Sequence, residues 1–272
     1  MPASHPIDVL FDAAAAGAAV EIPQGWGQGR AIFGGVVAGV LQARSLAAYE
    51  LDPATLRATT TSFVAPASPG PARVESILLR QGSSATQTET RLWQRDERTG
   101  EETIRGVQLS AYGLPRASAV DLPAARPAQA PPDPDRLVAL PCLPGFTPDF
   151  FAHVDLRVAS GSVPFTGSPT GDLSGYMRFR DAPRRVDLPH FIALVDAWPP
   201  AVGQCLRVPA AMSTQTWTLE LLAEPTGPAD QHWLYEVVTD AAHDGYAHSH
   251  ARVFTATGDP VAISRQSIAI FG

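Results

Sequence analysis

The chain of 272 residues contains no lysine and no asparagine, and all 20 of its basic residues are arginine. A Schiff-base enzyme, a phosphate-loop nucleotide hydrolase and a protein kinase each use a lysine amine, so the sequence excludes these classes. It also excludes a papain-like site with an orienting asparagine and an N-glycosylation acceptor. Lysine and asparagine have A-rich codons, and their absence therefore favours a high-GC, bacterial source.

Cysteine is scarce as well, with only Cys142 and Cys205 in the chain. Two cysteines cannot build a cysteine-based metal site, and a cytosolic disulfide is disfavoured, so we expect buried thiols without a chemical role. Long apolar runs are also missing. The most apolar N-terminal stretch, residues 13–20, follows no basic segment and is far shorter than the roughly 20 residues that cross a bilayer. We expect a cytoplasmic protein without a membrane partner.

The residues that are present describe a globular chain. The hydrophobic fraction is 45%, the charged fraction is 17% and the net charge is −7. A chain of this length and composition buries a large core in one large domain or in two of about 130 residues each. Its arginines are scattered rather than clustered, which predicts no nucleic-acid partner.

A proline-rich segment divides the chain. Nine prolines lie between Pro115 and Pro148, where no helical or strand period survives. We interpret residues 114–160 as a linker between an N-terminal unit, residues 1–113, and a C-terminal unit, residues 161–272. In the first unit, a buried helix over residues 33–48 precedes four strand-like runs, at 56–64, 72–79, 85–94 and 103–112.

The second unit repeats this order. A short strand at 175–179 precedes a helix over 187–197, which begins with Asp187 as its N-cap and a proline in its first turn. Four strand-like runs follow, at 212–222, 233–239, 246–255 and 260–270. Two copies of helix plus antiparallel sheet indicate a duplication in which the sheets join edge to edge and each curls around its own helix.

Four segments resemble a known family. They are residues 26–38 (WGQGRAIFGGVVA), 194–200 (LVDAWPP), 213–219 (STQTWTL) and 258–266 (GDPVAISRQ). Together they are similar to the double hot-dog proteins of the acyl-CoA thioesterase II type, over roughly residues 25–113 and 175–272. The resemblance implies an α+β double hot-dog fold and hydrolysis of an acyl-CoA thioester by an activated water, with CoA as part of the substrate and no separate cofactor.

Position by position, the resemblance implies a catalytic set of Asp196, Thr214 and Gln266. This set is chemically reasonable, because a carboxylate and oriented polar groups can activate water against a thioester carbonyl. The backbone amides of Gly34 and Gly35, at a helix N-terminus, are candidates for an oxyanion or phosphate site.

Each of the three catalytic candidates also has a structural interpretation. A carboxylate near a helix C-terminus is disfavoured by the helix dipole, which favours a function for Asp196. Strand alternation places Thr214 with Thr216 and Thr218, on the face opposite Trp217, where a β-branched residue is ordinary. Gln266 can equally be an exposed polar position of a strand.

The histidines, several arginines and the sheet edges also allow predictions. His248 and His250 share a strand face, but no carboxylate stands at a metal-ligand spacing, so no metal is expected. His153 and His190 are interpreted as structural. The arginines Arg30, Arg178 and Arg180 are candidates to pair with CoA phosphates. The exposed edges of a two-repeat sheet favour a homodimer or a higher oligomer.

Two alternatives to a thioesterase stay open. Hot-dog hydratases generally combine an aspartate with a histidine some five residues away, and no histidine follows Asp196 at that spacing. The other alternative is a non-catalytic acyl-CoA binding protein whose catalytic residues have drifted. The missing Gly-x-Ser-x-Gly and Gly-x-Gly-x-x-Gly motifs argue against an α/β-hydrolase and a dinucleotide-binding enzyme.

Overall fold

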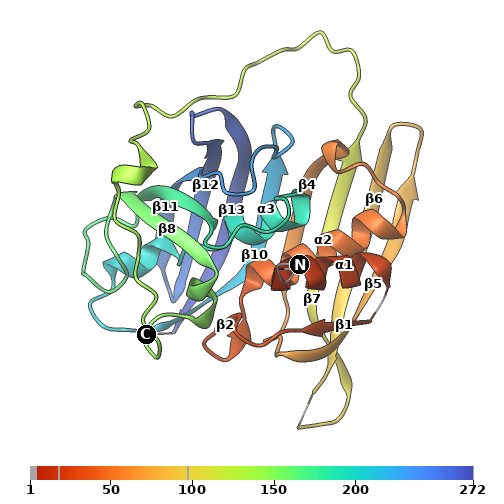
Figure 1. The fold of residues 1–272 in the computed structure, drawn as a ribbon, viewed down its shortest axis with the longest axis horizontal. Coiled ribbons are helices and arrows are strands. Elements are labelled where there is room, and N and C mark those ends of the chain that lie inside the picture. The colour runs from red at the N-terminus through yellow and green to blue at the C-terminus, as the bar shows by residue number, and fades with distance from the viewer. Residues whose placement is uncertain (1–4, 18, 97, 272) are drawn as a thin grey trace.

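The computed structural model describes residues 5–17, 19–96 and 98–271. Residues 1–4, 18, 97 and 272, which belong to the two predicted repeats, lie outside the described residues. The main element is an 11-stranded antiparallel sheet in the order β1-β5-β6-β7-β4-β10-β13-β12-β11-β9-β8. Figure 1 shows the helices gathered on one face of this sheet, which we call the helix face; the opposite face is the outer face.

The two predicted repeats are confirmed as two halves of this sheet. The first repeat comprises β1 (Ala19–Ile22), α2 (Gly34–Ala48), β4 (Leu56–Phe63), β5 (Gly70–Gln81), β6 (Ala85–Arg95) and β7 (Glu102–Gly113). The second comprises β8 (Val154–Ser160), β9 (Leu173–Phe179), α3 (Leu188–Val195), β10 (Ala211–Leu221), β11 (Trp233–His243), β12 (Tyr246–Thr255) and β13 (Pro260–Phe271). Every helix and strand predicted from the periodicity is present, with bounds shifted by a few residues at most.

The halves join at their central strands. β4 and β10 pair antiparallel, and Thr60 Oγ1 lies 3.0 Å from Thr218 Oγ1 across the junction on the outer face. Backbone hydrogen bonds therefore run without a break from one repeat to the other, as the predicted edge-to-edge pairing requires. A separate two-stranded hairpin, β2 (Gly27–Gln28) and β3 (Ala31–Ile32), precedes α2.

The two central helices run antiparallel in close contact, and two glycines of α2 make this possible. A Cβ placed on Gly35 would lie 2.2 Å from the carbonyl oxygen of Ala193, and one on Gly39 would lie 2.9 Å from that of Pro189. A side chain at either position would force the helices apart. The beginning of α2 therefore faces the end of α3, and this crossing positions the candidate site between the repeats.

Besides the short strand β1, the β2–β3 hairpin and the 3₁₀ turns, two elements were not predicted. The first is α1 (Pro6–Ala16), whose buried residues Ile7, Leu10, Phe11 and Ala14 follow the spacing of an amphipathic helix, a signal that the sequence did contain. The second is β8, which lies inside the segment interpreted as a linker. There Val154 and Leu156 are buried against the rest of the second repeat.

The proline-rich segment is docked rather than free. Figure 1 shows it passing from the end of β7 to β8 on the far side of the second repeat. Leu137 packs on the outer-face cluster of Tyr176, Leu234 and Phe254, and the Tyr176 hydroxyl donates to the carbonyl of Pro132 at 2.7 Å. The segment therefore covers apolar residues that would otherwise be exposed on the outer face.

The two cysteines lie at the surface of the protein. Cys142 and Cys205 are free thiols, but both are exposed, so the prediction that they are buried is wrong. They lie in the proline-rich segment and at the end of a short 3₁₀ turn, η4 (Ala201–Cys205), outside the packed layers. No helix within the described residues is long and apolar enough to cross a membrane.

Candidate active site

Asp196 lies at the meeting point of the two repeats. It follows the last residue of α3 and is its C-cap, and its carboxylate faces the beginning of α2. Gln266 Nε2 donates a hydrogen bond to Asp196 Oδ1 at 3.0 Å, and the backbone N–H of Gly35 donates to the same carboxylate. Three of the five predicted site residues, from a helix of each repeat and from β13, are thus brought together.

The surroundings of Asp196 change its acidity. Desolvation by the packed protein raises the pKa of Asp196 to about 7, although the hydrogen bonds from Gln266 and Gly35 act in the opposite direction. The position at a helix C-terminus also disfavours the charged form. A carboxyl group that titrates near neutral pH can accept and return a proton, as a general base and acid require.

Gln266 belongs to a row of residues across the helix face. It lies opposite Trp217 of β10 and Ser249 of β12 in the sheet register, and both of these neighbours are buried. Because directly opposed residues share a face, Gln266 points to the helices and not to solvent. The interpretation of Gln266 as an exposed surface position is therefore wrong.

Thr214 points to the same face because of a β-bulge. The register between β10 and β13 shifts between Thr214 and Thr216, so that Thr214 opposes Ile268 while Trp217 opposes Gln266. Ile268 and Gln266 are two residues apart on β13 and therefore point to the same face of the sheet. Thr214 and Trp217 point to that face too, so the predicted alternation, which placed them on different faces, is wrong. The extra residue, Gln215, re-aims the Thr214 side chain towards the helix face.

Gly34 is needed for space beside the carboxylate. A Cβ on Gly34 would lie 2.7 Å from Asp196 Oδ2 and 3.1 Å from two ring carbons of Phe63. The glycine pair thus accommodates the Asp196 carboxylate, and Gly35 also donates its N–H to it. Whether either amide also receives an oxyanion or a phosphate stays a prediction.

Gly34→Ala is expected to displace the Asp196 carboxylate. Because the new Cβ would overlap Oδ2, we expect kcat of any reaction that uses this carboxylate to fall by about 10-fold to 10²-fold, the scale on which small misplacements act. Gly17→Ala is the matched control, since nothing lies within 4 Å of a Cβ there. Equal kcat of both variants in steady-state kinetics would contradict the placement of the carboxylate.

The first repeat holds a neutral counterpart of this pair. Gln42 stands eight positions after the first residue of α2, as Asp196 stands eight positions after the first residue of α3. Ser110 of β7 donates to Gln42 Oε1 at 3.3 Å, in the place where Gln266 of β13 binds Asp196. An amide cannot serve as a general base, so this chain has its titratable group in the second repeat.

Several residues around Asp196 were not singled out in the sequence. Tyr235 of β11 is buried, and burial and the nearby charge of Asp196 raise its pKa. Ser264 of β13 accepts a hydrogen bond from Trp217 Nε1 at 2.8 Å. Only the pairing of β10 to β13, of β13 to β12 and of β12 to β11 brings these positions together, and no local motif indicates it.

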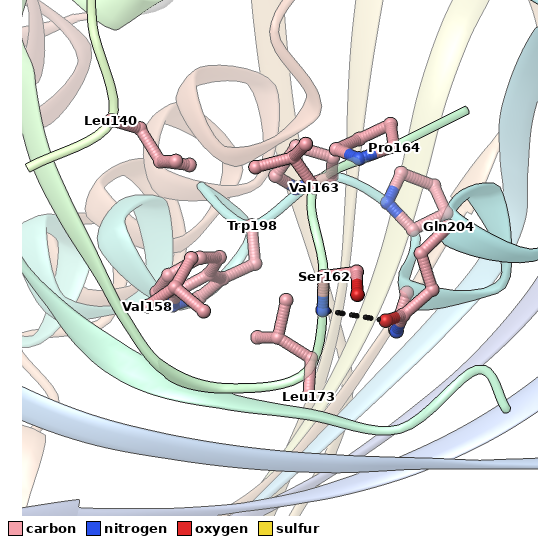
Figure 2. A pocket seen from close by; sticks show the side chains of 11 residues that line it. Leu140, Val158, Ser162, Val163, Pro164, Leu173, Trp198 and Gln204 are labelled. Atoms are coloured by element: carbon pink, nitrogen blue, oxygen red, sulfur yellow. Dashed lines mark hydrogen bonds between the residues drawn. The ribbon is translucent and has the colours of Figure 1, made fainter. Parts of the chain in front are cut away.

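Trp198 separates this region from a small pocket. Its indole stacks on Tyr235, with ring centroids 6.4 Å apart, and fills the space left by Gly175 of β9, where a Cβ would lie 2.5 Å from the ring. Figure 2 shows the pocket beyond it, with Leu140 and Leu173 on opposite sides and Val158 next to the indole. The free space inside the pocket is small, about 10 Å³, and the pocket opens to solvent.

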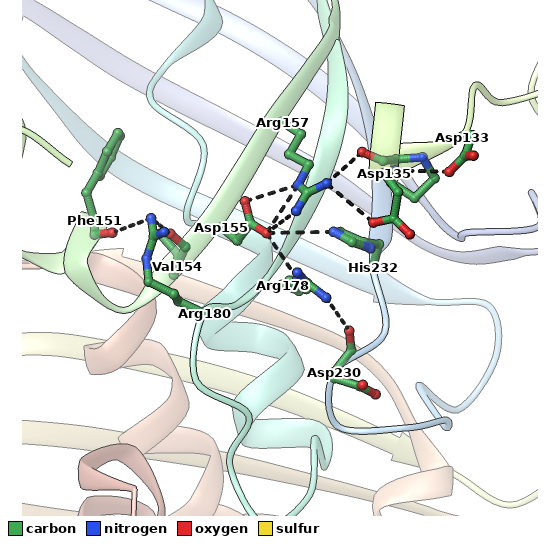
Figure 3. A network of polar contacts seen from close by, with 11 residues as sticks. Asp133, Asp135, Phe151, Val154, Asp155, Arg157, Arg178, Arg180, Asp230 and His232 are labelled. Carbon is green, nitrogen blue, oxygen red and sulfur yellow. Dashed lines mark hydrogen bonds and ion pairs between the residues drawn. The ribbon is translucent and has the colours of Figure 1, made fainter. Parts of the chain in front are cut away.

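Two of the three arginines proposed for CoA phosphates are already occupied. Arg178 pairs with the buried Asp155 at 3.1 Å, and Arg180 donates to the carbonyls of Phe151 and Val154, as Figure 3 shows. Their contacts favour a structural role. Arg30 is exposed in the turn between β2 and β3 and has no hydrogen bond or ion pair with any described residue.

The network of Figure 3 holds the proline-rich segment on the sheet. Arg157 donates to Asp155 at 3.0 Å and to the carbonyl of Pro134 at 2.8 Å, and it pairs with Asp135. Burial alone would raise the pKa of Asp155, but the hydrogen bonds and charges of Arg157 and Arg178 lower it. Ionised Asp155 therefore stabilises the folded protein.

Arg157→Met is expected to lower the free energy of unfolding at pH 7 by about 1–3 kcal/mol, the cost of depriving a buried charge of a hydrogen-bonding partner. Because the folded-state pKa of Asp155 is lowered, its contribution is present above the unfolded pKa and disappears as the pH falls. The loss should therefore shrink below about pH 4. Urea unfolding at each pH measures this loss of unfolding free energy. Arg136→Met, an exposed arginine of the same segment, is the control, and equal effects would contradict this role.

The histidines occupy other places. His190 is buried on α3 and bonds to Asp187 through Nδ1 and to Asp8 of α1 through Nε2, the latter at 3.0 Å, contacts that favour the structural interpretation. His248 and His250 lie on the outer face of β12, where His250 pairs with Asp240. Among the described residues, no group of three or more His, Cys, Asp or Glu side chains could hold a metal ion.

Comparison with known proteins decides the family. Residues 22–111 match the model of the acyl-CoA thioesterase N-terminal domain, and residues 123–270 match that of the acyl-CoA thioesterase C-terminal domain. The chain belongs to the acyl-CoA thioesterase family. The second match includes most of the proline-rich segment, in keeping with its docking on the second repeat. A search of curated proteins finds no match for this family member.

Solved structures share the whole fold of this thioesterase-family chain. A hot-dog protein of unknown function from Alicyclobacillus acidocaldarius is 21% identical, with a TM-score of 0.83 over 99% of each chain. A candidate thioesterase II from Thermobifida fusca is 25% identical, with a TM-score of 0.78 over 99% of this chain and 100% of that one. An acyl-CoA thioesterase II from Mycobacterium marinum is 18% identical, with a TM-score of 0.70 over 93% of each chain. The double hot-dog fold is confirmed.

Proposed function

We propose that the protein hydrolyses acyl-CoA thioesters, with Asp196 as the base that activates water. The observation that carries this proposal is a desolvated carboxyl group with a pKa of about 7, held by Gln266 and Gly35 where the two repeats meet. Membership of the acyl-CoA thioesterase family supports the thioester as the substrate class.

The proposed reaction needs only groups of this chain and water. Asp196 accepts a proton from water as the water oxygen attacks the thioester carbonyl carbon. The carbon–sulfur bond then breaks, and the proton on Asp196 passes to the CoA thiolate, whose thiol has a pKa near 8.5 by analogy with cysteine. Gln266 fixes the Asp196 carboxylate, and the Thr214 hydroxyl, turned inward by the bulge, hydrogen-bonds the water. The products are a free acid and CoA.

A hydratase is disfavoured by the position of its required histidine. Both ring nitrogens of His190, the histidine on α3, are engaged by Asp8 and Asp187. Within the described part of the chain, no recorded hydrogen bond or ion pair joins a histidine to Asp196. Burying a carboxyl group costs folding free energy, and Asp196 is buried in this way. A protein that only binds acyl-CoA would gain nothing from this cost, which argues against the non-catalytic alternative.

The test is release of CoA. Purified protein is mixed with acyl-CoAs of graded chain length, and free thiol is followed with a chromogenic disulfide. We expect release from at least one chain length, well above the uncatalysed rate. Measurable binding of acyl-CoA in calorimetry without release from any member of the series would establish a binding protein and overturn the proposal.

A further inference from the structure

We propose that Trp198 sets the length of the acyl chain that the site accepts, because its indole stands between Asp196 and an apolar pocket further along the helix face. This inference rests on the proposed function, since it assigns the acyl specificity of the same site. It begins from the position of Trp198, two residues after Asp196 and buried on the helix face.

The order of strands places Trp198 between the carboxylate and the pocket. From Gln266 of β13 the sheet continues through β12 and β11 to β9 and β8. The indole packs on Tyr235 of β11 and Gly175 of β9, and Val158, directly opposite Gly175 on β8, lines the pocket beyond. An acyl chain that extends from Asp196 along the helix face in this direction meets the indole first.

The pocket itself suits hydrocarbon. Most of its lining is apolar, from Leu140, Val158, Val163 and Leu173 together with the Trp198 turn (Figure 2). The polar groups of Gln204 are already used, because Oε1 accepts from the backbone N–H of Ser162 and Nε2 donates to the carbonyl of Asp172. The pocket alone has room for about one water molecule, so the space for further methylene groups would come from removing the indole that separates it from Asp196.

A second observation concerns the fit between this indole and the strand beneath it. Trp198 Nε1 is buried and has no hydrogen-bond partner among the described residues, although a buried indole N–H usually finds one. An unsatisfied buried donor costs folding free energy. Gly175, whose missing side chain makes room for the ring, shows that the strand is adapted to hold the indole here.

The experiment measures kcat/KM of the full-length protein for saturated acyl-CoAs lengthened two carbons at a time. Trp198→Leu is expected to raise the ratio of long-chain to short-chain kcat/KM by about tenfold or more, since each methylene group in an apolar pocket is worth that scale of discrimination. Trp198→Phe, which leaves a ring and disturbs folding less, should shift the ratio less and in the same direction.

A crossed variant separates this effect from a general loss of packing. Val158→Phe fills the pocket, so it should leave the chain-length profile of the wild type unchanged and reverse the shift in the Trp198→Leu background. Trp93→Leu, on the outer face beneath Arg73, is the matched control, because Trp93 also has a buried N–H without a recorded partner. Its profile should equal that of the wild type.

The outcomes distinguish the two proposals. If the wild type releases no CoA from any substrate, the proposed function has failed and this inference falls with it. If the wild type is active and the Trp198 variants keep its profile, losing activity in parallel at all lengths, the inference alone is overturned. A shift towards longer chains that Val158→Phe reverses supports it.

Discussion

Replacing Asp196 by asparagine is expected to lower kcat for acyl-CoA hydrolysis by at least ~10²-fold, the usual scale for losing a general base. Asparagine has the same shape and keeps an oxygen for the hydrogen bond from Gln266, but it cannot take a proton from water. KM should change little, because the proposed base acts on the water and not on the bound CoA. Steady-state kinetics with a saturating acyl-CoA measure both constants.

The control for this variant is Asp240→Asn. Asp240 is partly exposed and pairs with His250 on the outer face, remote from the helices. Its loss should leave kcat within a factor of about two, as for most surface changes. If Asp196→Asn retains near-normal turnover while remaining folded, Asp196 is not the base and the proposed mechanism is wrong.

The same substitution is expected to stabilise the protein at neutral and alkaline pH. The folded-state pKa of Asp196 is about 7, above the unfolded value near 3.9. The folded protein therefore binds this proton more tightly, and the contribution of Asp196 to stability is lost as the pH rises from about 4 to about 7. Full ionisation costs at most about 4 kcal/mol.

Unfolding by urea as a function of pH tests this expectation. The difference in unfolding free energy between Asp196→Asn and the wild type should be small below about pH 4, should grow between pH 4 and 7, and should then stay constant. Asp240→Asn should give no such rise. The kcat of the wild type should rise over the upper part of the same range, through about pH 7. A pH-independent difference would show that Asp196 ionises as an ordinary surface carboxylate does.

The sequence predicted most of the fold because its signals are local. Strand-like apolar runs marked nine of the strands, and the Gly34-Gly35 pair and the Asp187-Leu188-Pro189 segment marked the starts of both central helices. β8 was missed because a short strand that follows nine prolines has little period of its own. The α1 helix was missed although Ile7, Leu10, Phe11 and Ala14 have helical spacing.

The candidate site depends on contacts that no local pattern encodes. The resemblance indicated Asp196, Thr214 and Gln266, but the face of Thr214 could not be predicted, because a bulge is defined only against the partner strand. The contact of Asp196 with Gly34 and Gly35 arises from the crossing of two helices and joins residues more than 150 positions apart in sequence. Trp198 lies in the 194–200 segment of the resemblance, but only the structure shows that its indole packs on Gly175 and Tyr235.

The central claim is that water held by Asp196 cleaves the thioester. It is tested most directly by a single turnover, with enzyme in excess over acyl-CoA, in water enriched in ¹⁸O. We predict release of CoA together with one ¹⁸O in the carboxylate of the product acid and none in Asp196, as read by mass spectrometry of the acid and of the peptide that contains Asp196. An unlabelled acid with ¹⁸O in Asp196 would show that this residue attacks the carbonyl itself, and would contradict the account.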